Sequence, residues 1–453
     1  MTTSVNPTLH SRRSFLYRSS LAAAGFWIAR SSWARVSPNE KLNLGVIGTA
    51  NRAREDLRAV SSQNIAALCD VDENFLASAK RRYSDARTYN DFRKLLEQKD
   101  LDAVVIATPD HTHAVATVAA LQAGRHVYCE KPLTHTVSEA RIVAETARQY
   151  QRVTQMGTQI HASKNYRRVV EVIQSEAIGP VSEVHVWQGA VYTAGGRPKD
   201  RPPVPATLHW DLWLGPEAAR PYHPTYVPRH WRNWWAFGSG TLGDFGCHYM
   251  DLPFWALALR YPLSVETEGP PVLAEGTCPW LIARYEFPAR EVRLCARPEV
   301  APALLPALKL NWYHGSKDGR QVLPPLFAES KMPDRDVYAS GGVLFVGQKG
   351  MLLANYDKYV LLPDTDFAGH EPPPRSIPDS IGHHAEWIQA IKTGSATTCN
   401  FDYSGALTEA VLLGNAAYRS GTRIEWDPHH LVARGNPKAN RFIQHEYRKG
   451  WSL

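Results

Sequence analysis

Short apolar runs alternate with amphipathic stretches over residues 41–157. Apolar runs of strand length occur at residues 42–47, 65–68, 103–107, 126–129 and 153–157. The stretches between them, such as 114–123 and 137–150, carry apolar residues at helical spacing. Strands that alternate with helices in this way predict an α/β domain, a doubly wound parallel sheet with helices on both faces.

The hydrophobic pattern changes after residue 157. Long runs of alternating apolar and polar residues predict strands at 181–191, 281–287, 308–313 and 343–346, while helices are expected at 164–174, 242–259, 383–392 and 403–420. This pattern predicts an α+β domain built on a large, mainly antiparallel open sheet. We therefore divide the chain into residues 35–157, a Rossmann-type domain, and 158–453, the α+β domain. The open sheet face would favour a homodimer or homotetramer.

The first 34 residues have the features of an export signal. Arg12 and Arg13 precede a short apolar run at 21–29, and the small residues at 32–34 suit a signal peptidase. A paired arginine before such a run predicts a twin-arginine signal, export by the twin-arginine translocase and a periplasmic location. Because the apolar run is too short for a stable membrane span, an anchored form requires an uncleaved signal. A disordered basic tail is the alternative.

The positive charge gives no reason to expect nucleic-acid binding. Four arginines and no acidic residue lie within residues 1–34, so this segment holds more than half of the formal net charge of +7. The remainder has no basic patch with interleaved aromatic residues, the usual signature of nucleic-acid binding. The six cysteines show no paired spacing typical of metal ligands, and no metal is expected.

The turn after the first strand is an incomplete dinucleotide fingerprint. The Gly-x-Gly-x-x-Gly pattern lets the backbone approach a pyrophosphate, but here only Gly48 is kept, and Ala50 and Ala53 replace the other glycines. We expect Gly48, Ala50, Asn51 and Arg52 to contact a dinucleotide. The methyl group of Ala50 would lie where the phosphates come closest.

Asp70 adds weight to a dinucleotide site. It ends the second predicted strand, 22 residues after Gly48, where a carboxylate can hold the ribose hydroxyls of adenosine and repel a 2′-phosphate. Asp70 therefore favours NAD over NADP. The alternative is an ordinary aspartate at a strand end that caps the next helix.

Asp244 and His248 are candidates for proton transfer. If residues from 242 onward are helical, these side chains lie four positions apart on one face, and Asp251 continues the same stripe. Imidazole changes protonation near neutral pH, and a neighbouring carboxylate can orient it. A polar stripe that is hydrogen-bonded within its own protein would produce the same pattern.

Three motifs, taken together, resemble one protein family. They are Ala-Thr-Pro-Asp-His-Thr-His at 107–113, Glu-Lys-Pro-Leu at 130–133 and Gly-Asp-x-Gly-x-His-x-x-Asp at 243–251. In this order they resemble the Gfo/Idh/MocA oxidoreductases, typified by glucose–fructose oxidoreductase and inositol dehydrogenase. The helical segment 383–394 is also similar to this family. The main departure is the alanine-substituted turn after the first strand.

The resemblance implies roles for three catalytic residues. Lys131 would reach the substrate hydroxyl or carbonyl and the cofactor, and its fixed charge would stabilise a developing oxyanion. Asp244 would complete the site with His248, which would act as the general base in alcohol oxidation. Asp251 is expected to orient the surroundings of His248. The Lys131–Pro132 bond is a candidate for the cis form, which active sites retain.

The same resemblance assigns residues that bind rather than react. Thr108, Pro109 and His113 would line the nicotinamide end, although plain turn chemistry explains Pro109 and His113 equally well. Glu130 would also contact the cofactor, and Gln159 would face the substrate. The resemblance also implies that residues 158–453 bind the substrate and form the oligomer.

The family implies an NAD(H)-dependent oxidoreductase acting on a hydroxyl or carbonyl of a sugar, polyol or glycoside. Seven tryptophans between residues 187 and 255 suit stacking on a sugar, although core packing explains any single one as well. One alternative is an NAD-dependent glycosidase that oxidises, eliminates and reduces with a tightly held cofactor. A second is a non-catalytic protein that binds carbohydrate.

Overall fold

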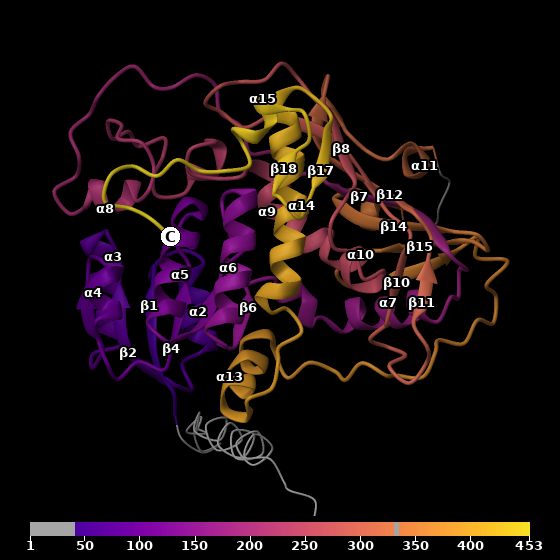
Figure 1. Ribbon diagram of the computed structural model, residues 1–453, viewed down its shortest axis with the longest axis horizontal. Helices are drawn as coiled ribbons and strands as arrows, with labels where there is room; N and C mark the ends of the chain where they lie inside the picture. Colours follow the sequence, from indigo (N-terminus) through magenta and orange to yellow (C-terminus); the bar gives the residue numbers. More distant parts are fainter. Residues whose placement is uncertain (1–40, 330–334) are drawn as a thin grey trace, which may run out of the picture.

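The computed structural model describes residues 41–329 and 335–453. The predicted export signal, residues 1–34, lies outside the described residues. No helix in the described ranges is long and apolar enough to cross a membrane. Figure 1 shows the parallel sheet and its helices on the left, a larger sheet on the right, and the long helix α14 (Phe401–Ser420) between them.

The first domain is built on a six-stranded parallel sheet, as predicted. Its strand order is β3-β2-β1-β4-β5-β6, with β1 Asn43–Ile47, β2 Asn64–Cys69, β3 Arg87–Tyr89, β4 Ala103–Ile106, β5 His126–Cys129 and β6 Thr154–Met156. Its helices are α2 Ala53–Ala59, α3 Glu73–Arg82, α4 Phe92–Leu96, η2 Asp110–Thr112, α5 His113–Gln122 and α6 Val137–Gln149. The strand order reverses between β1 and β4, and ligands bind such sheets at the carboxyl ends beside this point.

The second domain contains a ten-stranded sheet. The strands are β7 Val181–Gln188, β8 Ser264–Glu268, β9 Trp280–Phe287, β12 Leu308–Lys317, β13 Arg320–Gln321, β14 Gly341–Gly347, β15 Met351–Ala354, β16 Tyr359–Leu362, β17 Ile424–Asp427 and β18 Val432–Ala433. Neighbouring strands are antiparallel except β7 and β12, which are parallel, so the sheet is mixed. A separate hairpin-like pair joins β10 Arg290–Val292 to β11 Ala303–Leu305.

The remaining helices lie between or after these strands along the chain. They are η3 Gln159–Ala162, α7 Lys164–Gln174, α8 Trp210–Leu214, η4 His230–Asn233, α9 Gly240–Tyr249, α10 Asp251–Ala256, α11 Pro325–Ala328, α12 Arg335–Ala339, α13 His383–Thr393 and α15 Pro437–Asn440. Helix α13 returns to the first domain, where Trp387 and Ile391 join the core around Leu42 and Val46. The helix predicted at 242–259 is broken at Met250 into α9 and α10.

Helix α14 positions the helix that carries Asp244 and His248. The side chain of Asn400 caps its start by accepting hydrogen bonds from the backbone N–H groups of residues 402 and 403. Helix α9 packs against α14, and a Cβ added at Gly246 would lie 3.1 Å from the Val411 side chain. The small residues of the Gly-Asp-x-Gly motif therefore allow close approach of the two helices.

Candidate active site

Gly48 shapes the turn after β1. Its φ of +85° is left-handed, and an added Cβ would lie 2.5 Å from the carbonyl oxygen of Ala107, just beyond β4. Its N–H donates to the Cys69 carbonyl at 2.8 Å. Only glycine fits this turn without strain, because the ends of β1 and β4 approach so closely.

The carboxylate of Asp70 is fixed at the end of β2. Thr49 donates to its Oδ2 from both the backbone N and Oγ1, each at 2.8 Å, and the N–H of Asp72 donates to Oδ1 at 3.0 Å. Burial raises the pKa of Asp70 from its ordinary value. A carboxylate held rigidly at this strand end fits recognition of a ribose diol.

A cavity of about 890 Å³ opens at the carboxyl ends of the parallel strands. The turn at Gly48 and the fixed Asp70 form part of its wall, so the donor set fits a dinucleotide. The sequence-predicted residues that line it are Gly48, Ala50, Asn51, Arg52, Asp70, Thr108, Pro109, Glu130, Lys131, Gln159, Asp244 and His248.

His113 is the exception among the predicted site residues, since it does not line this cavity. Its ring is buried, and its two nitrogens each lie 2.8 Å from a carbonyl oxygen, that of Pro132 and that of Thr108. Burial lowers the pKa of His113 to about 4. His113 therefore joins the turns after β4 and β5 from behind the cavity wall.

Lys131 and Asp244 meet inside the cavity. The Lys131–Pro132 bond is cis, and Lys131 Nζ donates to Asp244 Oδ1 at 2.6 Å and to the Asp244 carbonyl at 2.9 Å. Although burial alone would raise it, the charges of Lys131 and Arg232 hold the pKa of Asp244 well below its usual range. Asp244 is therefore ionised and holds the lysine ammonium in place.

His248 lies one helical turn after Asp244 and faces the same cavity. Its Nδ1 has no hydrogen-bond partner among the described residues. Burial, followed by the charge of Lys131, lowers the pKa of His248 well below its usual range, so the ring is neutral at physiological pH. A neutral imidazole beside a lysine ammonium can accept a proton from a hydroxyl group.

Glu130 forms a buried network beside the site. Its Oε1 accepts hydrogen bonds from Arg52 Nε at 3.1 Å and from Gln159 Nε2 at 2.7 Å. Burial raises the pKa of Glu130 to about 7. Arg52 also pairs with Asp56 at 3.2 Å and with Glu55. Arg52, expected to contact the cofactor, thus lies against three carboxyl groups.

Sequence reasoning missed Arg232 and gave Asp110 no role. Arg232 Nε donates to Asp244 Oδ1 at 3.1 Å, and its guanidinium lies 4.1 Å from the centre of the Trp231 ring. Asp110 accepts from the Ser239 N–H at 3.1 Å, and burial raises its pKa to about 7. Trp-Arg-Asn-Trp-Trp at 231–235 is the signal that could have directed attention to Arg232.

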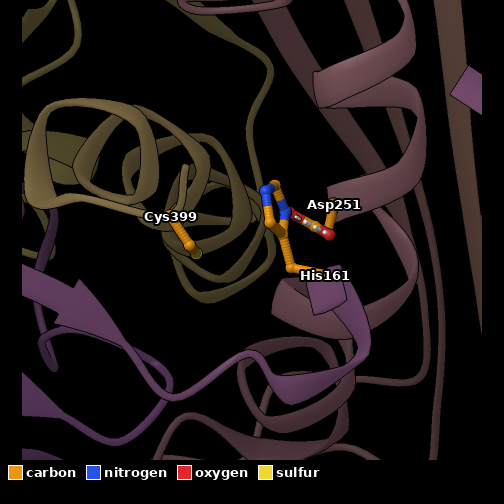
Figure 2. A group of neighbouring side chains, drawn as sticks. All are labelled: His161, Asp251 and Cys399. Atoms are coloured by element: carbon orange, nitrogen blue, oxygen red, sulfur yellow. Dashed lines mark hydrogen bonds and ion pairs between the residues drawn. The ribbon is translucent and has the colours of Figure 1, made fainter. Parts of the chain in front are cut away.

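The side chain of Asp251 is hydrogen-bonded to His161 and Tyr403 rather than to His248. Asp251 begins α10. Both its carboxylate oxygens lie 3.0 Å from His161 Nδ1, and Tyr403 donates to Oδ1 at 2.7 Å. Figure 2 shows the His161 ring between Cys399 and this carboxylate. In the part of the chain that the structure describes, these three are the single group with ligand atoms close enough for a metal, all within 4.8 Å. The hydrogen bonds of Asp251 to His161 and Tyr403 join α10 to η3 and to α14.

The tryptophans near the site serve mainly in packing. Trp213, Trp231 and Trp234 are buried in one small core, and of these Trp213 and Trp231 also border the cavity. Two tryptophans of this core thus border the cavity, while Trp234 packs within the segment.

Both domains match models of one oxidoreductase family. Residues 42–158 match its NAD-binding Rossmann fold, and residues 165–289 match its C-terminal alpha/beta domain. Inositol 2-dehydrogenase from Salmonella typhimurium is 31% identical over 198 residues, which are 40% of this chain and 58% of that enzyme. Levoglucosan dehydrogenase from Pseudarthrobacter phenanthrenivorans is 28% identical over 186 residues, 41% of this chain and 40% of the relative. The matched regions thus span about half the length of these curated relatives.

Solved structures share the fold. The WlbA dehydrogenase from Bordetella pertussis, in complex with NADH and UDP-GlcNAcA, has a TM-score of 0.58 at 16% identity, covering 86% of this chain and 99% of that chain. Since both domain models belong to one family, this chain is a member of the Gfo/Idh/MocA oxidoreductase family and its first domain is an NAD-binding Rossmann domain.

Proposed function

We propose that the protein is an NAD(H)-dependent oxidoreductase that transfers hydride between nicotinamide and a hydroxyl or carbonyl group of a sugar, polyol or glycoside. The observation that carries this proposal is the placement of Lys131, Asp244 and His248 in the same cavity as Gly48 and Asp70. The relatives named inositol and levoglucosan dehydrogenase support this substrate class.

The side chains divide the work of alcohol oxidation. When bound, NAD supplies the hydride acceptor. Neutral His248 accepts the hydroxyl proton, and the Lys131 ammonium stabilises the negative charge that develops on the substrate oxygen. Asp244 orients Lys131 through the 2.6 Å ion pair. In the reverse direction His248 returns the proton to the carbonyl oxygen.

Asp70 supports NAD over NADP as the cofactor. Its carboxylate lies at the cavity wall, where the 2′-phosphate of NADP would be repelled. Titration of purified protein with NADH and NADPH, followed by fluorescence, should give clearly tighter binding of NADH. Equal binding of both nucleotides would contradict this assignment.

A substrate panel tests the function. We would incubate the purified protein with NAD and inositols, levoglucosan, aldoses or nitrophenyl glycosides, and follow NADH absorbance and product release. NADH formed with a sugar or polyol supports the proposal. Glycoside cleavage without net NADH would favour the glycosidase alternative, and NAD binding without any conversion on a broad panel would favour a binding protein. Twin-arginine export and a homodimer or homotetramer stay predictions, to be checked by cell fractionation and light scattering.

A further inference from the structure

Residues 191–238 form a packed segment between β7 and α9. The segment contains α8 and η4 and has a hydrophobic core of its own, made by Trp213, Leu214, Tyr226, Trp231, Trp234 and Phe237. Buried aromatic residues of this size hold a segment in one arrangement. The segment is therefore packed as one unit.

One part of this segment is attached beside Asp70. A β-bridge joins Asp72 to Leu208, and the N–H of His209 donates to the Val71 carbonyl at 2.9 Å. His209 Nε2 also lies 3.0 Å from Glu73 Oε1. The segment thus crosses the carboxyl end of β2 immediately after the residue that fits the adenosine ribose.

The C-terminal tail reinforces the same edge. Arg448 donates to the Gly215 carbonyl at 2.6 Å and to Asp211 Oδ1 at 2.5 Å. Trp451 lines the cavity, and its ring centre lies 6.0 Å from that of Phe92. Figure 1 shows this yellow tail running back past α8 to end over the first domain. Two segments distant in sequence therefore cover the nucleotide-binding edge.

Arg229 extends from the segment 191–238 to the turn after β1. Its Nε donates to Asn51 Oδ1 at 3.0 Å, and both residues line the cavity. Arg52, the other arginine at this turn, is paired with three carboxylates. No carboxylate among the described residues pairs with Arg229, so its positive charge remains available to a ligand.

We propose that residues 191–238 cover the bound NAD and that Arg229 binds its pyrophosphate. The turn after β1 is where a Rossmann domain receives the pyrophosphate, and in this chain Ala50 replaces the glycine that allows the closest backbone contact. An arginine guanidinium forms strong, charge-assisted hydrogen bonds with phosphate oxygens. Arg229 therefore supplies from the second domain a contact that the altered turn weakens. The inference rests on the proposed function only in taking NAD as the ligand.

Binding measurements with and without the pyrophosphate test this assignment. Arg229→Gln removes the charge while keeping an amide that can donate to Asn51, and Arg229→Ala removes both. Arg197→Ala is the matched control, because Arg197 lies in the same segment but pairs with Glu275 at 2.6 Å outside the cavity lining. We would measure NADH binding by fluorescence, then displacement of NADH by ADP-ribose and by adenosine, with thermal melting to check folding.

The expected result is selective for the pyrophosphate. Both Arg229 variants should bind ADP-ribose about 10- to 100-fold more weakly, the usual effect of losing a hydrogen bond to a charged group. Their affinity for adenosine should stay within about twofold of the wild type. Arg197→Ala should change neither. If the wild type binds NADH, then unchanged ADP-ribose binding in the variants, or an equal loss of affinity for ADP-ribose and adenosine, would overturn the assignment. A wild-type protein that binds no NADH would instead contradict the proposed function.

Discussion

Lys131 and Asp244 are 113 residues apart in the sequence, yet their charged atoms lie 2.6 Å apart in the structure. The same Oδ1 of Asp244 also accepts from Arg232 Nε at 3.1 Å. The ion pair is largely buried, with side-chain exposures of 12% for Lys131 and 9% for Asp244. Because Asp244 retains Arg232 when the lysine is removed, the lysine can be tested without leaving a buried carboxylate unpaired.

Lys131→Ala should lower kcat by about 10² to 10³-fold, because a fixed positive charge is removed from the developing oxyanion. Steady-state NADH formation measures this, and thermal melting should show a folded protein. Asp244→Asn should act on the same unit, so the double variant should lose less than the product of the two single losses. Independent, multiplicative losses would mean that the two residues do not act together.

His248→Asn should lower kcat by about 10² to 10⁴-fold, because the general base is lost while the cavity is kept. NADH affinity, measured by fluorescence, should stay within about twofold, since the cofactor turn is distant in sequence and independently formed. His113→Asn serves as a comparison, because His113 lies behind the wall and should act mainly through stability. Normal turnover by the His248 variant would remove it from the mechanism.

Gly48→Ala should destabilise the protein by more than the roughly 1 kcal/mol expected for a left-handed alanine, and should also weaken NAD binding. The added Cβ would lie 2.5 Å from the Ala107 carbonyl oxygen. Gly369→Ala is the matched control, since Gly369 has a φ of +84° with nothing within 4 Å. Urea unfolding of both variants separates the cost of backbone strain from the cost of the contact with Ala107. Equal losses in the free energy of unfolding would argue against the close approach.

Ala50→Gly should tighten NADH binding by about two- to fivefold, because glycine permits the closer backbone approach of the usual fingerprint. The gain should be larger in the Arg229→Gln background, where the proposed arginine contact is missing. Fluorescence titration of the four proteins measures this coupling. A clear loss of affinity in Ala50→Gly would show that the pyrophosphate lies elsewhere.

Asp110→Asn should change how stability depends on pH. Burial raises the pKa of Asp110 to about 7, against 3.8 for an exposed aspartate. Between these values the folded protein keeps a proton that the unfolded chain has released, so this group lowers the free energy of unfolding as pH rises, by at most about 1.4 kcal/mol per unit. Asparagine can still accept from the Ser239 N–H. The free energy of unfolding of the variant, measured with urea, should therefore rise relative to that of the wild type from about pH 4 to pH 7. A difference that does not depend on pH would contradict this.

Local patterns predicted most of the first domain. Strands β1, β2, β4, β5 and β6 and helix α6 lie within two residues of their predicted bounds, because buried parallel strands are continuous apolar runs. Strand β3, only three residues and largely exposed, lacked such a signal. The helix break at Met250 was also missed, as was the contact between Asp251 and His161.

The fold class, a candidate dinucleotide site at the strand ends and candidate residues for proton transfer were predictable from the sequence, since these depend on local periodicity and on motifs that follow strands. Which charges meet depended on the tertiary structure: Arg232 with Asp244, Arg52 with Glu130, and Arg229 with the turn at Asn51. Such pairs depend on how a connecting segment is packed, and chain spacing carries no information about that. The alanine-substituted turn was visible in the sequence, but the arginine beside it became visible only in the folded chain.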